Sequence, residues 1–325
     1  MLVEAFAKAL PPGTINLISG SGRATMPPLM AAGAVDGLAF IGGSTAADSL
    51  IRDHPEPHRL KVFLQLEAKN MAIYLPDIVE TKNALLLDHA VSETVLGALS
   101  YNGQRCTALK IIFVPKSKSK AILTRLKTQI EALKVGLPWE SGTQITPLPN
   151  KKRISYMKEL IADAVSLGAN ILNENGGEII GGENSTLMIP ALIHPVTETM
   201  KLFHEEQFGP IVPVVEYESL DEVMAYARSS KYGQQVSIFT SEGEDAAPIV
   251  DKFSSIFGKI NINSQCSRSP DTLPFSGRRS SAMGVMSVVD ALREFSVPTV
   301  VSYKVGQEEI ARKIGADSSF MSSLS

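Results

Sequence analysis

Apolar residues recur along this 325-residue chain with helical spacing in some segments and as short runs in others. In the first eighty residues, a helix-like segment at 2–10 ends at two prolines and a glycine, and an apolar run at 14–19 predicts a short strand. A second strand at 38–41 leads through two glycines into a helix that runs to residue 51. Alternating strands and helices are typical of an α/β layer with parallel strands.

The same alternation continues from about residue 81 to 263 around a long apolar segment at 84–99, which predicts a buried helix. In the helix predicted at 151–166, apolar residues recur every three or four positions, so we assign them to the core. We expect a second α/β unit here, and a terminal strand within 295–303. The predicted strands of this unit are 108–114, 186–193, 211–217, 236–240 and 259–263, and its further helices are 121–133 and 220–228.

Cys106 is one of only two cysteines and follows a glycine-containing turn. That turn would carry it from the helix at 84–99 toward a cleft. Arg105 adds a neighbouring cation, which favours the thiolate, the reactive form of cysteine. On these residues alone, a buried structural cysteine is an equal alternative.

Composition indicates a globular protein and excludes several other classes. The net charge is -3, so neither nucleic acid nor an anionic membrane is expected as a partner. No uncharged run approaches the ~18 residues of a membrane span, and the first residues lack the apolar core of a signal peptide. Two cysteines cannot form a disulfide framework, so we expect a cytoplasmic protein. We predict no metal site.

Four motifs occur in the order found in the aldehyde dehydrogenase superfamily, and the chain resembles that family from about residue 3 to 304. The segment around Cys106 is similar to the family's nucleophile motif, in the form of the non-phosphorylating glyceraldehyde-3-phosphate dehydrogenases. The four motifs are Asn-Gly-Gln-Arg-Cys-Thr at 102–107, Leu-Gln-Leu-Glu-Ala-Lys-Asn at 64–70, Glu-Glu-Gln-Phe-Gly-Pro at 205–210 and Pro-Phe-Ser-Gly-Arg at 274–278.

The resemblance implies an aldehyde dehydrogenase fold with a particular division of the chain. Residues 1–80 would be a partial Rossmann-like nucleotide-binding domain, and residues 81–263 an α/β catalytic domain that carries the cysteine. Residues 264–304 would be a C-terminal return segment whose strand joins a neighbouring subunit, which implies a homo-oligomer. Residues 305–325 would be a tail.

The resemblance also assigns cofactor and substrate contacts. It implies NADP or NAD, with the carboxylate of Glu206 on the nicotinamide ribose and Phe208 against the nicotinamide ring. A glycine-rich turn between a strand and a helix is a usual phosphate site, although an ordinary turn has the same composition. The further candidate cofactor contacts are Gly20, Gly42, Ser44 and Leu66.

Two arginines indicate the class of substrate. Arg105 directly precedes the nucleophile, and Arg268 matches a phosphate-binding arginine of the glyceraldehyde-3-phosphate branch. Guanidinium groups bind phosphate in a bidentate fork, so the pair would select a phosphorylated aldehyde. Surface ion pairing is the alternative reading.

The chain departs from the family pattern at its catalytic base. The family has a glutamate where this chain has Gln65, and a carboxamide cannot take up a proton near neutral pH. If the strand that begins at Lys61 continued to Glu67, that carboxylate would lie on the same side as Gln65, about 6–7 Å further along. Glu67 is therefore a candidate base, with an exposed charge at the strand end as the alternative.

The resemblance also leaves roughly half of a family member's length before Met1, including an asparagine that helps to stabilise the oxyanion. We therefore expect an N-terminally truncated relative, whose sheet would expose an edge and an apolar face. Three functions remain open. The chain oxidises an aldehyde, such as glyceraldehyde 3-phosphate to 3-phosphoglycerate; or it is a silent binding or subunit-interaction module; or it passes an acyl group to a thiol acceptor.

Overall fold

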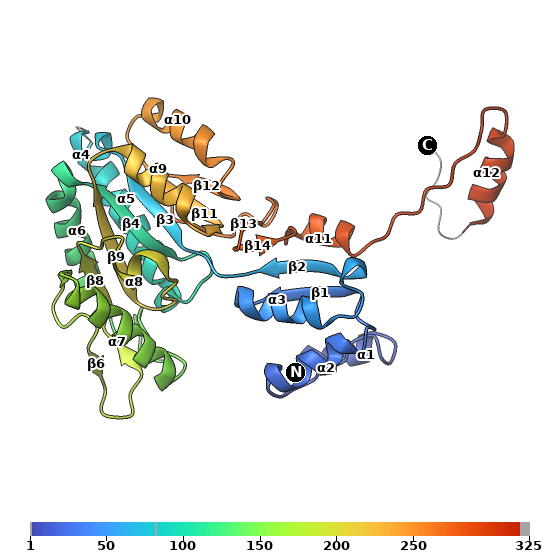
Figure 1. Cartoon of the computed structure of the whole chain (residues 1–325), viewed down its shortest axis with the longest axis horizontal. Coiled ribbons are helices and arrows are strands. Elements are labelled where there is room, and N and C mark those ends of the chain that lie inside the picture. Colours follow the sequence, from blue (N-terminus) through green and yellow to red (C-terminus); the bar gives the residue numbers. More distant parts are fainter. Residues whose placement is uncertain (1, 82, 319–325) are drawn as a thin grey trace.

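The computed structural model describes residues 2–81 and 83–318, which fold around two principal sheets of unequal size (Figure 1). The larger sheet has the order β12-β11-β3-β4-β9-β8-β5, and its neighbours are parallel except for β5 and β8. Its strands are β3 (Asn70–Tyr74), β4 (Leu109–Pro115), β5 (Asn170–Ile171), β8 (Ala191–His194), β9 (Ile211–Tyr217), β11 (Gln235–Phe239) and β12 (Lys259–Ile262).

Helices cover both faces of this larger sheet and give it two apolar cores. Strands between two helical layers are buried on both sides, which explains why β4 is buried along its whole length. One face carries α7 (Lys151–Ser166), α8 (Lys201–His204), α9 (Leu220–Ser229) and α10 (Gly243–Phe253). The other carries α5 (Ala84–Leu99) and α6 (Ser119–Glu131).

The smaller sheet has the order β1-β2-β14, with β1 (Gly37–Ile41) parallel to β2 (Lys61–Gln65) and β14 (Ala282–Met283) antiparallel to it. Two helices, α2 (Gly22–Ala31) and α3 (Ser44–Asp53), pack on one face through Met30, Ala47 and Leu50. Within the described residues, β1 is an edge strand and Ile41 at its end is exposed. The expected open edge is therefore present among the described residues, whereas Phe63 of β2 is buried.

The chain crosses from the smaller to the larger sheet between Gln65 and Asn70, and β14 later returns to the smaller one. This crossing lies ahead of the boundary that we expected at residue 80. It matters for the site because the crossing segment joins the ends of two sheets.

Two predicted strands are absent from the structure. Residues 14–19 have no regular structure, and the apolar side chains of Leu17 and Ile18 are exposed. Residues 295–303 form no strand either, and Val297 and Val300 face solvent. A strand needs a partner for its backbone groups, and neither segment has one within the described chain. Phe295 stacks on Phe63 of β2.

Other predicted elements are confirmed. The helices at 84–99 and 151–166 and the strand at 211–217 have the expected bounds. The predicted strand at 186–193 is divided, because Ile189 and Pro190 separate β7 (Leu187–Met188) from β8. The remaining elements are α1 (Leu2–Ala9), α4 (Asp77–Glu80), α11 (Val288–Glu294), α12 (Glu308–Asp317), the short helices η1 (Pro57–Arg59), η2 (Ser100–Gly103) and η3 (Lys116–Lys118), and β6 (Ile179–Ile180), β10 (Tyr232–Gly233) and β13 (Arg278–Arg279).

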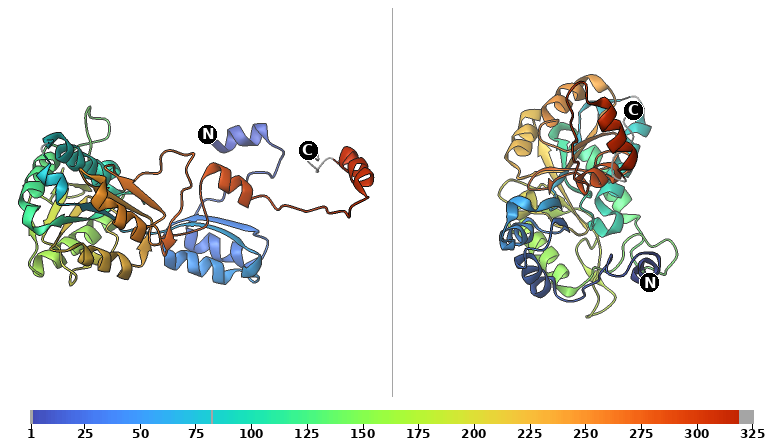
Figure 2. Two further views of the ribbon diagram at one scale, coloured as in Figure 1. Left: turned by 90° about the horizontal axis from the view of Figure 1, so that it is seen from above. Right: turned by 90° about the vertical axis from the view of Figure 1, so that its right-hand side faces the viewer.

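The described chain is elongated, with the two sheets side by side and α12 projecting at the end of an extended segment (Figures 1 and 2). None of the helices in the described part of the chain is both long and apolar enough to cross a membrane.

Candidate active site

A cleft of about 1070 Å³ lies where the two sheets meet. Its walls come from the ends of β1 and β2, from the turn after α5 and from the segments around residues 206 and 268. In a parallel sheet, the carboxyl ends of the strands are where ligands usually bind. The cleft brings together most of the expected site residues, namely Gly42, Gln65, Leu66, Glu67, Arg105, Cys106, Glu206, Phe208 and Arg268.

The turn that presents Cys106 has an unusual backbone. Tyr101, Asn102 and Gly103 all have positive φ angles, of 53°, 58° and 69°. The buried Asn102 side chain accepts a hydrogen bond from the backbone N–H of Thr146 at 2.8 Å, which fixes the turn. A Cβ on Gly103 would lie only 2.5 Å from the carbonyl oxygen of Gly209. The Asn-Gly pair of the motif is thus required by the local geometry.

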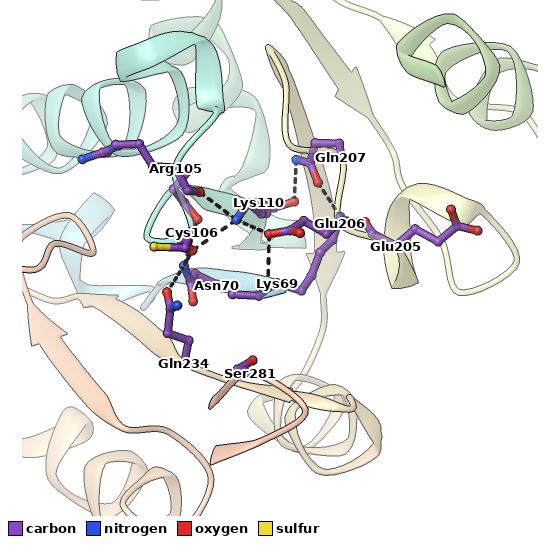
Figure 3. A network of polar contacts seen from close by, with 12 residues as sticks. Lys69, Asn70, Arg105, Cys106, Lys110, Glu205, Glu206, Gln207, Gln234 and Ser281 are labelled. Atoms are coloured by element: carbon purple, nitrogen blue, oxygen red, sulfur yellow. Dashed lines mark hydrogen bonds and ion pairs between the residues drawn. The ribbon is translucent and has the colours of Figure 1, made fainter. Parts of the chain in front are cut away.

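Two buried side chains donate hydrogen bonds to the main chain of Cys106 (Figure 3). Asn70 Nδ2, at the start of β3, donates to the Cys106 carbonyl oxygen at 2.8 Å. Lys110 Nζ, on β4, donates to the same oxygen at 3.1 Å. Figure 3 shows the cysteine sulfur pointing away from these donors. The thiol is therefore left to face the cleft, while its main chain is fixed.

Lys110 also anchors the candidate cofactor residue Glu206. Its Nζ lies 2.6 Å from Glu206 Oε1, and the backbone N–H of Ala68 donates to the same oxygen at 3.1 Å. The Lys110 side chain is only 1% exposed. Burial lowers the pKa of Lys110, and the carboxylate of Glu206 acts in the opposite direction. A buried ammonium group needs such partners. Lys110 therefore holds both the Glu206 carboxylate and the main chain of Cys106.

Phe208 lies beside this ion pair at the wall of the cleft. Lys110 Nζ is 5.4 Å from the centre of its ring, and the guanidinium carbon of Arg153 is 5.6 Å away. The φ angle of Phe208 is +42°, an unusual value for an aromatic residue. The expected neighbours Glu206 and Phe208 therefore line the same cleft as Cys106.

Gln65 is buried without any hydrogen-bond partner for its side chain. It is 2% exposed, and neither amide atom has a partner within the described residues. Buried polar groups are nearly always satisfied, and those that are not point to a bound ligand or a strained site. Gln65 is also one of the residues that line the cleft, so this unsatisfied amide belongs to the candidate site.

Glu67 does not lie on the strand that we expected to carry it. β2 ends at Gln65, so Glu67 does not share one side of a strand with Gln65, and this prediction was wrong. Glu67 Oε2 instead accepts a hydrogen bond from the backbone N–H of Ser44 at 2.8 Å, and Ser44 Oγ lies 3.4 Å from Oε1. The carboxylate thus sits at the first residue of α3.

The remaining carboxylates of the cleft are engaged as well. Glu205 Oε2 accepts a hydrogen bond from the hydroxyl of Tyr156 at 2.9 Å, and Glu206 is paired with Lys110. Each of the three carboxylates among the described lining residues therefore has a protein partner in this structure.

The two arginines both line the cleft, but each has protein partners. Arg105 Nη2 donates to the carbonyl oxygen of Gly97 at 3.1 Å and to Gln265 Oε1 at 3.2 Å. Burial lowers the pKa of Arg105, and the nearby Cys266 and Cys106 oppose this shift. Arg268 is exposed, with its Nε 3.5 Å from Asp271 Oδ1.

Of the other expected cofactor contacts, Leu66 and Ser44 lie at or beside the cleft, whereas Gly20 does not. Leu66 is buried, and its backbone N–H donates to the Ser281 carbonyl oxygen at 2.9 Å. Ser44 begins α3 next to the cleft. Gly20 is exposed in the turn before α2 and is not among the residues that line the cleft, because the strand expected before it is absent.

Sequence reasoning missed the two residues that support the nucleophile. Lys110 stands alone as a charged residue in an apolar strand, and a buried lysine almost always has a specific partner. That signal was visible in the sequence. Asn70 closes the motif at 64–70, but its contact with Cys106 depends on the pairing of β3 with β4.

Cys266 is clearly different from Cys106. It is fully buried, and its sulfur lies 3.3 Å from the hydroxyl of Ser237. Burial raises the pKa of Cys266 to about 12. Cys106 is partly exposed, so only it can meet a ligand in the cleft.

Comparisons with known proteins find similarity to one enzyme family. The sequence pattern of the aldehyde dehydrogenase family matches residues 1–301. The NADP-dependent glyceraldehyde-3-phosphate dehydrogenase of Streptococcus equinus is 32% identical over 314 residues, which are 96% of this chain and 61% of that protein. The Pisum sativum enzyme of the same name is 30% identical over 292 residues, 90% of this chain and 55% of the relative.

Solved structures give the same result. The NADP-dependent glyceraldehyde-3-phosphate dehydrogenase from Bacillus halodurans C-125, complexed with NADP, is 33% identical with a TM-score of 0.81, covering 90% of this chain and 58% of that one. An NAD-dependent aldehyde dehydrogenase from Sinorhizobium meliloti is 24% identical with a TM-score of 0.84, covering 94% of this chain and 58% of that one, which supports the fold.

Proposed function

Because the chain belongs to the aldehyde dehydrogenase family, we propose that it oxidises an aldehyde through a thioester on Cys106, with NADP or NAD as the hydride acceptor. The chain spans 55–61% of the length of the two curated relatives described above. The observation that carries the proposal is the fixed main chain of Cys106, with its sulfur free in a cleft that Glu206 and Phe208 also line.

The chemistry follows from the position of the sulfur. The Cys106 thiolate bonds to the carbonyl carbon of the aldehyde, and the carbonyl oxygen takes the negative charge of a thiohemiacetal. Loss of a hydride from that carbon re-forms the carbonyl group and leaves a thioester. The nicotinamide cofactor supplies the acceptor for this hydride. Asn70 and Lys110 keep the cysteine main chain in place during both steps.

The residues of the cleft fit a dinucleotide. The volume is ample for a ligand of that size. The strand-glycine-helix turn from β1 to α3 offers a helix N-terminus for phosphate groups, with Gly42 at the wall. Glu206 offers a carboxylate for ribose hydroxyls, and Phe208 an apolar face for a flat ring.

We propose a phosphorylated aldehyde as the substrate, with glyceraldehyde 3-phosphate as the first to test. Support comes from two arginines at the cleft and from the NADP-dependent glyceraldehyde-3-phosphate dehydrogenases among the relatives. The ion pair of Arg268 with Asp271 is exposed, and exposed pairs contribute little stability. To bind a phosphate, the guanidinium would give up this pair, its hydrogen bond to the Met286 carbonyl oxygen and its contact with the Phe275 ring. Arg268→Ala should raise KM for the phosphorylated aldehyde far more than for an unphosphorylated one. Equal effects on both would refute the assignment.

Gln65 favours a second fate for the acyl group. An amide cannot deprotonate water, and Glu205 and Glu206 are held by Tyr156 and Lys110. The thioester would then wait for a better nucleophile than water, such as a thiol acceptor. Transfer would exchange one thioester for another and return Cys106 as a thiol.

The test is a time course of cofactor reduction. With glyceraldehyde 3-phosphate and NADP, we expect about one equivalent of reduced cofactor per chain in a fast phase, followed by a slow phase, because deacylation lacks a base. Cys106→Ser should abolish both phases, whereas Cys266→Ser, a matched control at a buried thiol, should keep them. Absence of cofactor reduction in the unmodified chain with either NADP or NAD would contradict the proposal and favour a silent binding module.

We further propose that the chain assembles with copies of itself in the cytoplasm. Apolar side chains of the extended segment, including Val297 and Val300, are exposed and free to meet a second chain. Both cysteines are without a disulfide, as in a reducing compartment. Light scattering of the purified chain tests the assembly, and a monomer at high concentration would refute it.

A further inference from the structure

The N-terminus of α3 already holds an anionic group from the protein itself. The capping position, Gly43, has no side chain to offer, so the first N–H of the helix needs a partner from elsewhere. Glu67 Oε2 supplies it, 2.8 Å from the backbone nitrogen of Ser44. This contact joins residues 23 positions apart and depends on the chain leaving β2 directly after Gln65.

The same N–H group is where a phosphate would bind. Backbone donors and the helix dipole both favour an anion at this place, and the preceding strand and glycine pair are typical of nucleotide sites. Gly42, Gly43 and Glu67 all line the cleft that contains Cys106. A phosphate group and the Glu67 carboxylate cannot occupy this position together, because they would share one donor and repel each other.

The wall of the cleft has a second polar group without a hydrogen-bond partner among the described residues. Gln65 lies two residues before Glu67 and is 2% exposed, with neither amide atom hydrogen-bonded within the described chain. This observation is independent of the helix. An unsatisfied buried amide is a usual mark of a ligand site, and this one lies on the crossing segment at the wall of the same cleft.

Glu67 is held only lightly. Ser44 is the one hydrogen-bond donor to its carboxylate among the residues that the structure describes, and no ion pair restrains it there. The side chain is partly exposed at the edge of the cleft, so it can rotate into solvent. Moving the Glu67 carboxylate away breaks only its contacts with the N–H and hydroxyl of Ser44, and it changes no helix or strand.

We propose that Glu67 determines the affinity for the cofactor, because its carboxylate competes with the diphosphate of the dinucleotide for the N-terminus of α3. The inference rests on the proposed use of a nicotinamide dinucleotide. In this role Glu67 is not a general base. It affects the binding of the cofactor, and it does not affect the rate at which the acyl group on Cys106 is hydrolysed.

The test compares ligand binding by the unmodified chain, Glu67→Gln and Glu56→Gln. The glutamine at 67 keeps an oxygen for the Ser44 N–H but removes the charge. The exposed Glu56 forms its ion pair with Arg59 and is absent from the lining of the cleft, so Glu56→Gln changes the net charge equally without touching α3. The probes are ADP and NADP, measured by isothermal titration, with thermal unfolding as the check on folding.

We expect Glu67→Gln to bind ADP and NADP about 2- to 30-fold more tightly, the range for one charge at a helix N-terminus. Glu56→Gln should bind as the unmodified chain does. Equal or weaker binding by Glu67→Gln would overturn the inference while leaving the proposed function intact. No binding by any of the three chains would overturn the inference together with the cofactor on which it rests.

A second measurement separates this part from that of a base. A preformed acyl group on Cys106, in the absence of cofactor, should be hydrolysed at the same rate in Glu67→Gln and in the unmodified chain. A rate lowered tenfold or more would make Glu67 the base and would overturn its assignment to the cofactor site.

Discussion

The Gln65→Glu variant tests the reason for slow deacylation most sharply. Gln65 is buried at the wall of the cleft, so a glutamate there would be a carboxylate with no hydrogen-bond donor among the described residues. A positioned general base contributes about 10²–10⁴ in rate. Burial without partners raises the pKa of a carboxyl group toward neutrality, which suits it to accept a proton from water.

The same burial predicts a cost in stability. Each unit by which the folded state raises the pKa costs about 1.4 kcal/mol when the carboxylate is ionised. Because the pKa is raised on folding, the unfolded state releases its proton first. The free energy of unfolding of Gln65→Glu therefore begins to fall near pH ~4.3, the pKa of the unfolded state, and the decrease is complete above the raised pKa of the folded state. Stability of Gln65→Glu relative to the unmodified chain should fall as the pH rises through this window.

The assay is single-turnover hydrolysis of an acyl group placed on Cys106, followed by intact mass. Gln65→Met is the matched control, since it keeps the length of the side chain and removes the unpartnered amide. It should be at least as stable as the unmodified chain, because an unsatisfied buried group is lost. It should also hydrolyse no faster. Equal hydrolysis by Gln65→Glu and Gln65→Met would refute the reasoning that a missing base limits deacylation.

Three further predictions concern the turn that carries Cys106, the buried ion pair beside it and the accessibility of the two thiols. Gly103→Ala should lower the free energy of unfolding by about 1–3 kcal/mol in urea titrations, because its Cβ would meet the Gly209 carbonyl oxygen; an unchanged midpoint would contradict this. Lys110→Met should cost about 3–5 kcal/mol by the same measurement, because it leaves the carboxylate of Glu206 without its buried cation; a neutral effect would refute the pairing. At pH 8, iodoacetamide should add one group per folded chain, because burial raises the pKa of Cys266 to about 12; two rapid additions would show that this thiol is accessible.

The sequence predicted the larger unit well because its elements are buried. The helices at 84–99 and 151–166 and the strand at 211–217 have apolar patterns that only one kind of element satisfies. The apolar run at 14–19 has the same composition as a strand, yet it forms none, since pairing depends on a partner that no local pattern reveals. The valines near residue 300 also have the composition of a strand, and they too form none because they have no strand to pair with.

The motifs located the cleft but not its contacts. Cys106, Glu206 and Phe208 were brought together as the resemblance implied. The bond from Lys110 to Glu206 spans 96 positions and follows from the pairing of β4 with its neighbours, so no spacing rule could supply it. Glu67 was assigned to a strand that ends two residues earlier, and one change of backbone direction moved its carboxylate to α3.

The central claim is that Cys106 carries the acyl group of an oxidised aldehyde. Intact mass of the chain after incubation with glyceraldehyde 3-phosphate and NADP tests it most directly. The account predicts one acyl adduct, located at Cys106 by peptide mapping, with one reduced cofactor for each adduct. An unmodified chain and unreduced cofactor, with NAD as well as with NADP, would contradict it.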